Sequence, residues 1–153
     1  MLSYLYKGAD IVRFAVSNAA DAEAIPAIKA QTNAALVADI QRDWRLAVMA
    51  VEKGIDKVRV NPGNIGAEEN IRRVADAVKA HGIPVRVGGN SGSIEKTSLQ
   101  KYGLSAAALG ESVLRDVSRF EKYGVTDIVI SVKASSVPLM VQAYQYVAAR
   151  CDY

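Results

Sequence analysis

The sequence predicts an α/β fold in which about five parallel strands alternate with helices. Short apolar stretches that favour strands alternate along the 153 residues with longer amphipathic stretches that favour helices. A glycine that ends a helix precedes a strand four times, at Gly8, Gly54, Gly82 and Gly124. Such alternation gives a parallel sheet, either an open doubly wound sheet or part of a (β/α)8 barrel. A complete barrel needs about 250 residues and eight strands, so only part of one is expected here.

The first half of the chain contains two of the expected strands. Its expected elements are a helix end at residues 1–7, a strand at 10–16, a short helix at 21–31, a strand at 35–40 and a helix at 43–53. Pro26 limits how early the short helix becomes regular. Asp43 is a suitable N-cap for the longer helix, and Gly54 is a suitable end.

The second half contains the remaining three strands. Its expected elements are a strand at 56–61, a helix at 67–81, a strand at 84–88, a glycine- and serine-rich loop at 88–93, a helix from Ser105 to Gly124, a strand at 127–132 and a helix from 136 to about 150. In the strand at 56–61, Val58 and Val60 alternate with polar residues, so one face is apolar. Pro62 ends this strand in a glycine-bounded turn before a helix, where α/β proteins bind anions.

Composition excludes several classes of protein. The net charge is only +3 and Lys and Arg form no runs, so nucleic-acid binding is not indicated. Cys151 is the only cysteine, which excludes an internal disulfide or a metal–sulfur site and favours a reducing compartment, the cytoplasm. No apolar run approaches the roughly 18 residues of a membrane span. We expect residues 1–153 to form a single segment without an internal linker.

The expected strands carry cations on one face. Because side chains alternate along a strand, one inward-facing set is predicted for each strand. These sets bring together Arg13, Arg59, Arg86 and Lys133, with Asn61, Asn90 and Asp39 beside them. Burying cations without partners costs several kcal/mol each, so a multiply charged anion is the natural completion. Arginine forks suit phosphate oxygens, and the sequence therefore predicts a phosphate-type site.

Other interpretations of these residues remain open. A single inward arginine is often paired with an acidic neighbour, and Asp39 fits that role better than the role of general base. Lys133 is either a phosphate-binding cation or, if desolvated, a Schiff-base lysine. Gln41 and Ser131 are hydrogen-bonding residues without assigned chemistry, and no catalytic residue or metal ligand is assigned.

Six segments resemble one known family. They are residues 9–13 (ADIVR), 37–40 (VADI), 57–66 (KVRVNPGNIG), 85–96 (VRVGGNSGSIEK), 101–103 (KYG) and 130–135 (ISVKAS). Together they resemble the 4-hydroxy-3-methylbut-2-enyl diphosphate synthases, and the resemblance extends over essentially the whole chain. It implies that the fold is a partial TIM (β/α)8 barrel, the substrate-binding domain of an iron–sulfur oxidoreductase.

The resemblance also implies a reaction. The family reductively opens 2-C-methyl-D-erythritol 2,4-cyclodiphosphate in the methylerythritol phosphate route to isoprenoids. It uses a four-iron four-sulfur (4Fe-4S) cluster in a separate C-terminal domain, flavodoxin or ferredoxin as electron donor, and a homodimeric assembly. By position, Arg13, Arg59, Asn61, Arg86, Asn90 and Lys133 correspond to residues that hold the cyclic diphosphate, with Asp39, Gln41 and Ser131 as possible support.

This sequence departs from the family pattern in three ways. Gln41 stands where the family usually has His, and Gly89 stands where it usually has Val. The cluster cysteines are absent, and Cys151 does not match one of them. The segment alone is therefore expected to bind no cluster and to be inactive. A Schiff-base aldolase that uses Lys133 and a non-catalytic phosphate-binding α/β barrel are the alternative functions.

Overall fold

Five parallel strands form one sheet in which neighbours in sequence are also neighbours in space. The computed structural model describes residues 7–153, so the helix end expected at residues 1–7 lies, except for Lys7, outside the described residues. The strands are β1 (Ile11–Ala15), β2 (Ala35–Ile40), β3 (Lys57–Val60), β4 (Val85–Asn90) and β5 (Ile128–Lys133), in the order β1-β2-β3-β4-β5. Sequential order distinguishes a barrel segment from a doubly wound sheet, whose strand order reverses at a switch point. The predicted α/β fold with five parallel strands is confirmed.

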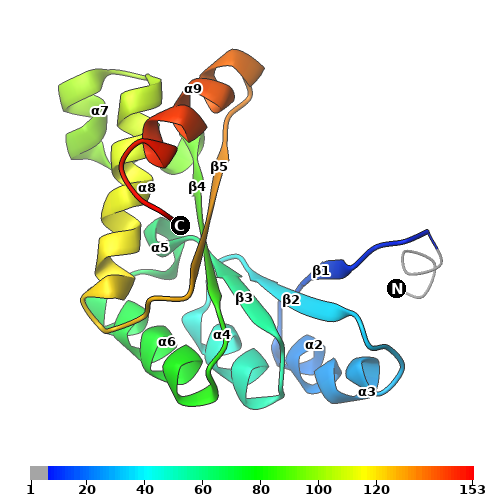
Figure 1. Cartoon of the computed structure of the whole chain (residues 1–153). Helices are drawn as coiled ribbons and strands as arrows, with labels where there is room; N and C mark the ends of the chain where they lie inside the picture. Colours follow the sequence, from blue (N-terminus) through cyan, green and yellow to red (C-terminus); the bar gives the residue numbers. More distant parts are fainter. Residues whose placement is uncertain (1–6) are drawn as a thin grey trace.

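Helices connect the strands. They are α2 (Ala19–Glu23), α3 (Ile25–Lys29), α4 (Trp44–Glu52), α5 (Pro62–Ile65), α6 (Glu68–His81), α7 (Lys96–Tyr102), α8 (Ala106–Glu121) and α9 (Val137–Ala148), with the 3-10 helix η1 (Ser91–Ser93) after β4. Right-handed crossovers between sequential strands place the connecting helices on one face of the sheet. Figure 1 shows α4, α6 and α8 along the same side of the strands. The opposite face is therefore free to carry a site.

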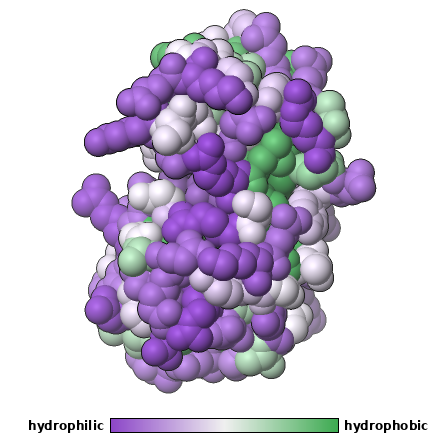
Figure 2. All heavy atoms as spheres, turned by 90° about the vertical axis from the view of Figure 1, so that its left-hand side faces the viewer, coloured by the Kyte–Doolittle hydropathy of each residue, from purple (hydrophilic) through white to green (hydrophobic). Residues whose placement is uncertain are grey.

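The core lies between the sheet and these helices. Val58 and Val60 of β3 are fully buried and belong to the same apolar cluster as Ile71 of α6 and Val113 of α8. The outward surface of the helices is predominantly hydrophilic (Figure 2). Helices α4, α6 and α8 thus each bury an apolar stripe in this core, as amphipathic periodicity predicts. Within residues 7–153, no helix combines the length and apolar character needed to cross a bilayer.

Local signals fix several helix ends as the sequence predicts. Asp43 accepts a hydrogen bond from the backbone N–H of Arg45 at the start of α4, and Ser105 accepts one from Ala108 at the start of α8. Gly82 closes α6 in the left-handed conformation, with φ at 62°. These caps place the strands that follow in the positions expected from the sequence.

The structure corrects three expectations about local structure. The single helix expected at residues 21–31 is two short helices, because Pro26 lacks an N–H and begins a second helix. The turn after β3 is the short helix α5, capped by Asn61 with Pro62 in its first turn. The loop expected at 88–93 begins too early, since β4 continues through Asn90, and residues 91–93 form the 3-10 helix η1.

Candidate functional site

A polar hollow of about 280 Å³ lies on the sheet face that carries the predicted inward side chains. Its lining residues are Arg13, Asp39, Arg59, Arg86, Asn90, Ser131, Val132, Lys133 and Tyr144. All four predicted cations therefore line one pocket, which we call the cation pocket. They come from β1, β3, β4 and β5, so the pocket extends across the whole sheet.

Strand register explains why these side chains meet. Asp39 of β2 lies opposite Arg59 of β3, and Arg59 lies opposite Arg86 of β4. Further along the sheet, Asn90 of β4 lies opposite Lys133 of β5. Residues opposite each other on one face have neighbouring side chains, so two rungs of the sheet bring most of the charged residues of the pocket together.

One carboxylate serves two of the arginines. Asp39 Oδ1 lies 3.2 Å from Arg59 Nη1, and Asp39 Oδ2 lies 3.7 Å from Arg13 Nε. Arg86 and Lys133 take part in no ion pair among the described residues. The cation pocket therefore carries a surplus of positive charge that this part of the chain does not neutralise.

Two donors in the pocket are buried without acceptors. The Nε atoms of Arg59 and Arg86 have almost no accessible surface and no hydrogen-bond partner. A buried donor without an acceptor costs about 1–3 kcal/mol, and more when it is charged. Such an arrangement is typical of a site that is organised for a ligand rather than for stability.

Two predicted residues do not line the pocket. Asn61 is buried below it, where its Oδ1 accepts from the N–H of Gly63 at 3.0 Å and its Nδ2 donates to Ser93 Oγ at 3.0 Å. Ser93 Oγ in turn donates to the carbonyl oxygen of Asn90 at 3.2 Å. Asn61 therefore joins the loops after β3 and β4. Gln41 is exposed just after β2 and does not line the pocket.

Sequence reasoning missed two pocket residues, Val132 and Tyr144, of which Tyr144 is the polar one. Its hydroxyl oxygen accepts a hydrogen bond from the backbone N–H of Val132 at 3.1 Å, which leaves the phenolic proton free to donate. Tyr144 belongs to α9, so strand periodicity carries no signal for it. A helical tyrosine becomes a candidate only when the packing of α9 against β5 is known.

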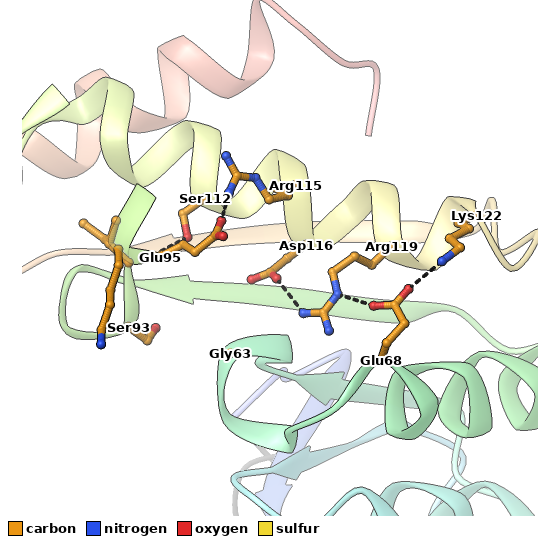
Figure 3. Close-up of a pocket in the computed structure, with 11 residues that line it drawn as sticks. Gly63, Glu68, Ser93, Glu95, Ser112, Arg115, Asp116, Arg119 and Lys122 are labelled. Carbon is orange, nitrogen blue, oxygen red and sulfur yellow. Dashed lines mark hydrogen bonds and ion pairs between the residues drawn. The ribbon is translucent and has the colours of Figure 1, made fainter. Parts of the chain in front are cut away.

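A larger hollow of about 700 Å³ lies among the helices (Figure 3). In Figure 3, Glu68 from the start of α6 points toward Arg119 of α8 and toward Lys122, which follows that helix. Arg115 of α8 points toward Glu95. Glu68 also accepts a hydrogen bond from Tyr123 Oη at 3.0 Å. The acidic residues that line this hollow thus already have basic partners. We therefore assign the hollow to helix packing rather than to ligand binding.

Two carboxyl groups in this hollow titrate abnormally. The hydrogen bond from Arg119, helped by those from Lys122 and Tyr123, lowers the pKa of Glu68 to about 2. Burial raises the pKa of Asp116 to about 6, although Arg119, 3.5 Å away, opposes this shift. Arg119 lies closer to Glu68, at 2.8 Å. The arginine therefore stabilises one carboxylate more than the other.

We expect Asp116→Asn to raise the free energy of unfolding by about 1–3 kcal/mol above pH 6. The folded pKa of Asp116, about 6, exceeds its ordinary value of 3.8, so ionisation is penalised in the folded state. The gain should shrink as pH falls from 6 to 4, because the native carboxyl is then protonated. Urea unfolding of the parent chain and of Asp116→Asn across this pH range measures the gain in the free energy of unfolding. The exposed Asp76→Asn is the control, and a gain independent of pH would contradict the assignment.

The described residues do not fit an iron–sulfur cluster. No group of three His, Cys, Asp or Glu side chains among residues 7–153 is arranged to hold a metal ion. Cys151 is a half-buried free thiol whose Sγ lies 3.6 Å from the carbonyl oxygen of Val147. A cluster needs several thiolate ligands, so we derive no chemical step from one in this chain.

Comparisons with known proteins identify the family of this chain. Residues 2–153 match the family model described as the GcpE TIM-barrel domain. The chain is 50% identical over 148 residues to the 4-hydroxy-3-methylbut-2-en-1-yl diphosphate synthase (flavodoxin) of Caldanaerobacter subterraneus subsp. tengcongensis, covering 96% of this chain and 42% of that protein. It is 47% identical over 147 residues to the protein of the same name from Fusobacterium nucleatum, covering 95% and 42%.

The chain therefore spans about two fifths of the length of these relatives. A solved structure, the Amycolatopsis orientalis BexX/CysO complex, contains a chain that is similar with a TM-score of 0.52 and 21% identity. The similarity covers 97% of this chain and 59% of that chain, and at this identity it supports the fold alone.

Proposed function

The chain belongs to the GcpE TIM-barrel domain family, and from this premise we propose that the cation pocket binds the cyclic diphosphate substrate of a 4-hydroxy-3-methylbut-2-enyl diphosphate synthase. The proposed ligand is 2-C-methyl-D-erythritol 2,4-cyclodiphosphate, held by Arg13, Arg59, Arg86, Lys133 and Asn90. Asp39 and Ser131 would support the arginines and the floor of the pocket. Asn61 would act indirectly, by ordering the loops above the strands.

One observation carries this proposal: four cations in a single pocket face one carboxylate, and two of their Nε atoms lack partners. A ligand with two phosphate groups supplies the missing negative charge and several acceptor oxygens. Arginine binds phosphate through parallel hydrogen bonds, which fixes orientation as well as affinity. The barrel would therefore hold the diphosphate and orient the ring for reduction.

The remaining parts of the reaction belong to the proposal as well. The relatives' names identify flavodoxin as their electron donor, and we propose flavodoxin, or a ferredoxin, for the complete protein here. A 4Fe-4S cluster would supply the electrons in the complete protein, and its ligands would then lie outside residues 7–153. On this basis the 153 residues bind substrate without turnover, and the complete protein is a cytoplasmic homodimer.

Calorimetric titration of the chain with the cyclodiphosphate tests this proposal. We expect saturable binding that weakens as salt is added, because ion pairs dominate the contact. The uncharged 2-C-methyl-D-erythritol is the matched control and should not bind. Equal binding of both compounds, or none of the cyclodiphosphate at millimolar concentration, would refute it.

The same preparation tests the Schiff-base alternative. Lys133 is exposed at the end of β5, whereas a Schiff-base lysine is normally desolvated in an apolar pocket. We therefore expect no covalent adduct on Lys133 after borohydride treatment with carbonyl compounds. A trapped adduct, seen by mass spectrometry, would favour the aldolase reading instead.

A further inference from the structure

The guanidinium of Arg59 occupies the space where a side chain at position 88 would stand. A Cβ atom built on Gly88 would lie 2.5 Å from Arg59 Nη2, 2.6 Å from Nε and 2.8 Å from Cζ. Arg59 lies opposite Arg86 in the register, and Gly88 is two residues further along the same face of β4. The Arg59 side chain therefore extends along the sheet and fills the space beside Gly88, which any larger residue at position 88 would occupy.

The way in which Arg59 rests on Gly88 decides which of its atoms face the rest of the pocket. Nη2 and Nε both lie nearer to the built Cβ than Cζ does, so the guanidinium presents its Nε–Nη2 edge to Gly88. Nη1 is not one of these three, and it is the nitrogen that donates to Asp39 at 3.2 Å. Nε is buried against the strand without a partner. In this pose Arg59 donates to Asp39 on β2 and borders the pocket at the same time.

We propose that Gly88 is a positioning residue for the anion in the cation pocket: its missing side chain leaves room for the Nε–Nη2 edge of the Arg59 guanidinium against β4, which keeps Nη1 directed at Asp39. The inference rests on the proposed function, because it assumes that Arg59 contacts the bound diphosphate. Gly88 itself need not touch the ligand. Ser131, opposite Gly88 on β5, is also small. These two residues therefore leave space at the bottom of the cation pocket.

The adjacent glycines provide a matched comparison. A Cβ at Gly89 would lie 2.1 Å from Val113 Cγ2 on the other face of the sheet, whereas a Cβ at Gly92 would meet no atom within 4 Å. An alanine at position 88 meets the end of a flexible side chain, which can move away. An alanine at position 89 meets a fully buried valine, which cannot. Gly88→Ala is therefore expected to fold normally and to displace Arg59.

The first experiment measures binding of the cyclodiphosphate by calorimetry. Gly88→Ala should weaken binding by about 10- to 100-fold, because misplacing a charged group by about 1 Å has effects of that size. Gly92→Ala should bind within about twofold of the parent chain. In an Arg59→Met background, Gly88→Ala should cause no further loss, since the residue it positions is gone.

The second experiment observes Arg59 directly and does not need the ligand. In the parent chain, the buried Nε–H of Arg59 should give a slowly exchanging signal in ¹⁵N NMR spectra, assigned by its loss in Arg59→Met. Gly88→Ala should shift this signal and speed its exchange with water, while Gly92→Ala leaves it unchanged. An unchanged signal or unchanged affinity in Gly88→Ala overturns the inference.

If the parent chain does not bind the cyclodiphosphate, the proposed function fails, and with it the role of Gly88 in binding. The NMR result then still decides whether Gly88 places Arg59.

Discussion

Arg86→Met is expected to weaken binding of the cyclodiphosphate by about 2–4 kcal/mol, roughly 30- to 1,000-fold. The same change should raise the free energy of unfolding of the unliganded chain by about 1 kcal/mol. Arg86 has a buried Nε without a partner and lies directly opposite another cation, Arg59. Removing the Arg86 guanidinium relieves the cost of its unpartnered Nε and its repulsion of Arg59 in the free protein. It also removes a positive charge that would bind the ligand. Calorimetry and urea unfolding measure the two effects.

The opposite signs of these two effects make the prediction specific. Arg73→Met is the matched control, because Arg73 pairs with Glu69 on the exposed side of α6. An exposed pair of this kind contributes less than about 1 kcal/mol, so neither quantity should change much. If Arg86→Met destabilises the chain instead, Arg86 stabilises the fold and the prediction is wrong.

Gly89→Val is expected to lower the free energy of unfolding by about 2–3 kcal/mol. For a chain of this length, that corresponds to a fall in Tm of about 5–10 °C. The family pattern that residues 85–96 resemble has Val here, and Val normally favours a strand. In this chain, however, Val113 of α8 fills the space, with Cγ2 2.1 Å from the built Cβ. Thermal unfolding followed by circular dichroism measures the loss.

Val113→Ala should rescue this variant. Alone, it leaves a cavity below the sheet and costs about 1–3 kcal/mol. Combined with Gly89→Val, it makes room for the new side chain, so the double variant should lie within about 1 kcal/mol of the parent chain. Additive losses in the double variant would show that β4 and α8 do not compete for this volume.

The strands and the cation pocket were predictable from sequence because both depend on a simple period. Val58 and Val60 alternate with Lys57 and Arg59, and each parallel strand repeats the rule with its own residues. Cations at alternate positions on neighbouring strands then have to share one face, even where their heights along the sheet differ. Short-range patterns thus determined which residues meet, although they did not determine the contacts among them.

The remaining features depend on contacts that periodicity does not encode. Asn61 was predicted to face the ligand, but an Asn before a Pro at the start of a helix is also a strong capping signal. The helix α7 was missed because no apolar period marks its seven residues. Asp116 and Glu68 lie on separate helices, so their unequal sharing of Arg119 appears only once α6 and α8 are packed.

The two neighbouring glycines of β4 are expected to follow different evolutionary histories. Position 89 competes for volume with position 113, so among relatives a bulky residue at one should accompany a small residue at the other. Position 88 is constrained instead by the Arg59 side chain beside it, and it should stay Gly in relatives that keep this arginine. A single step along the backbone therefore separates a residue constrained by helix packing from one constrained by chemistry.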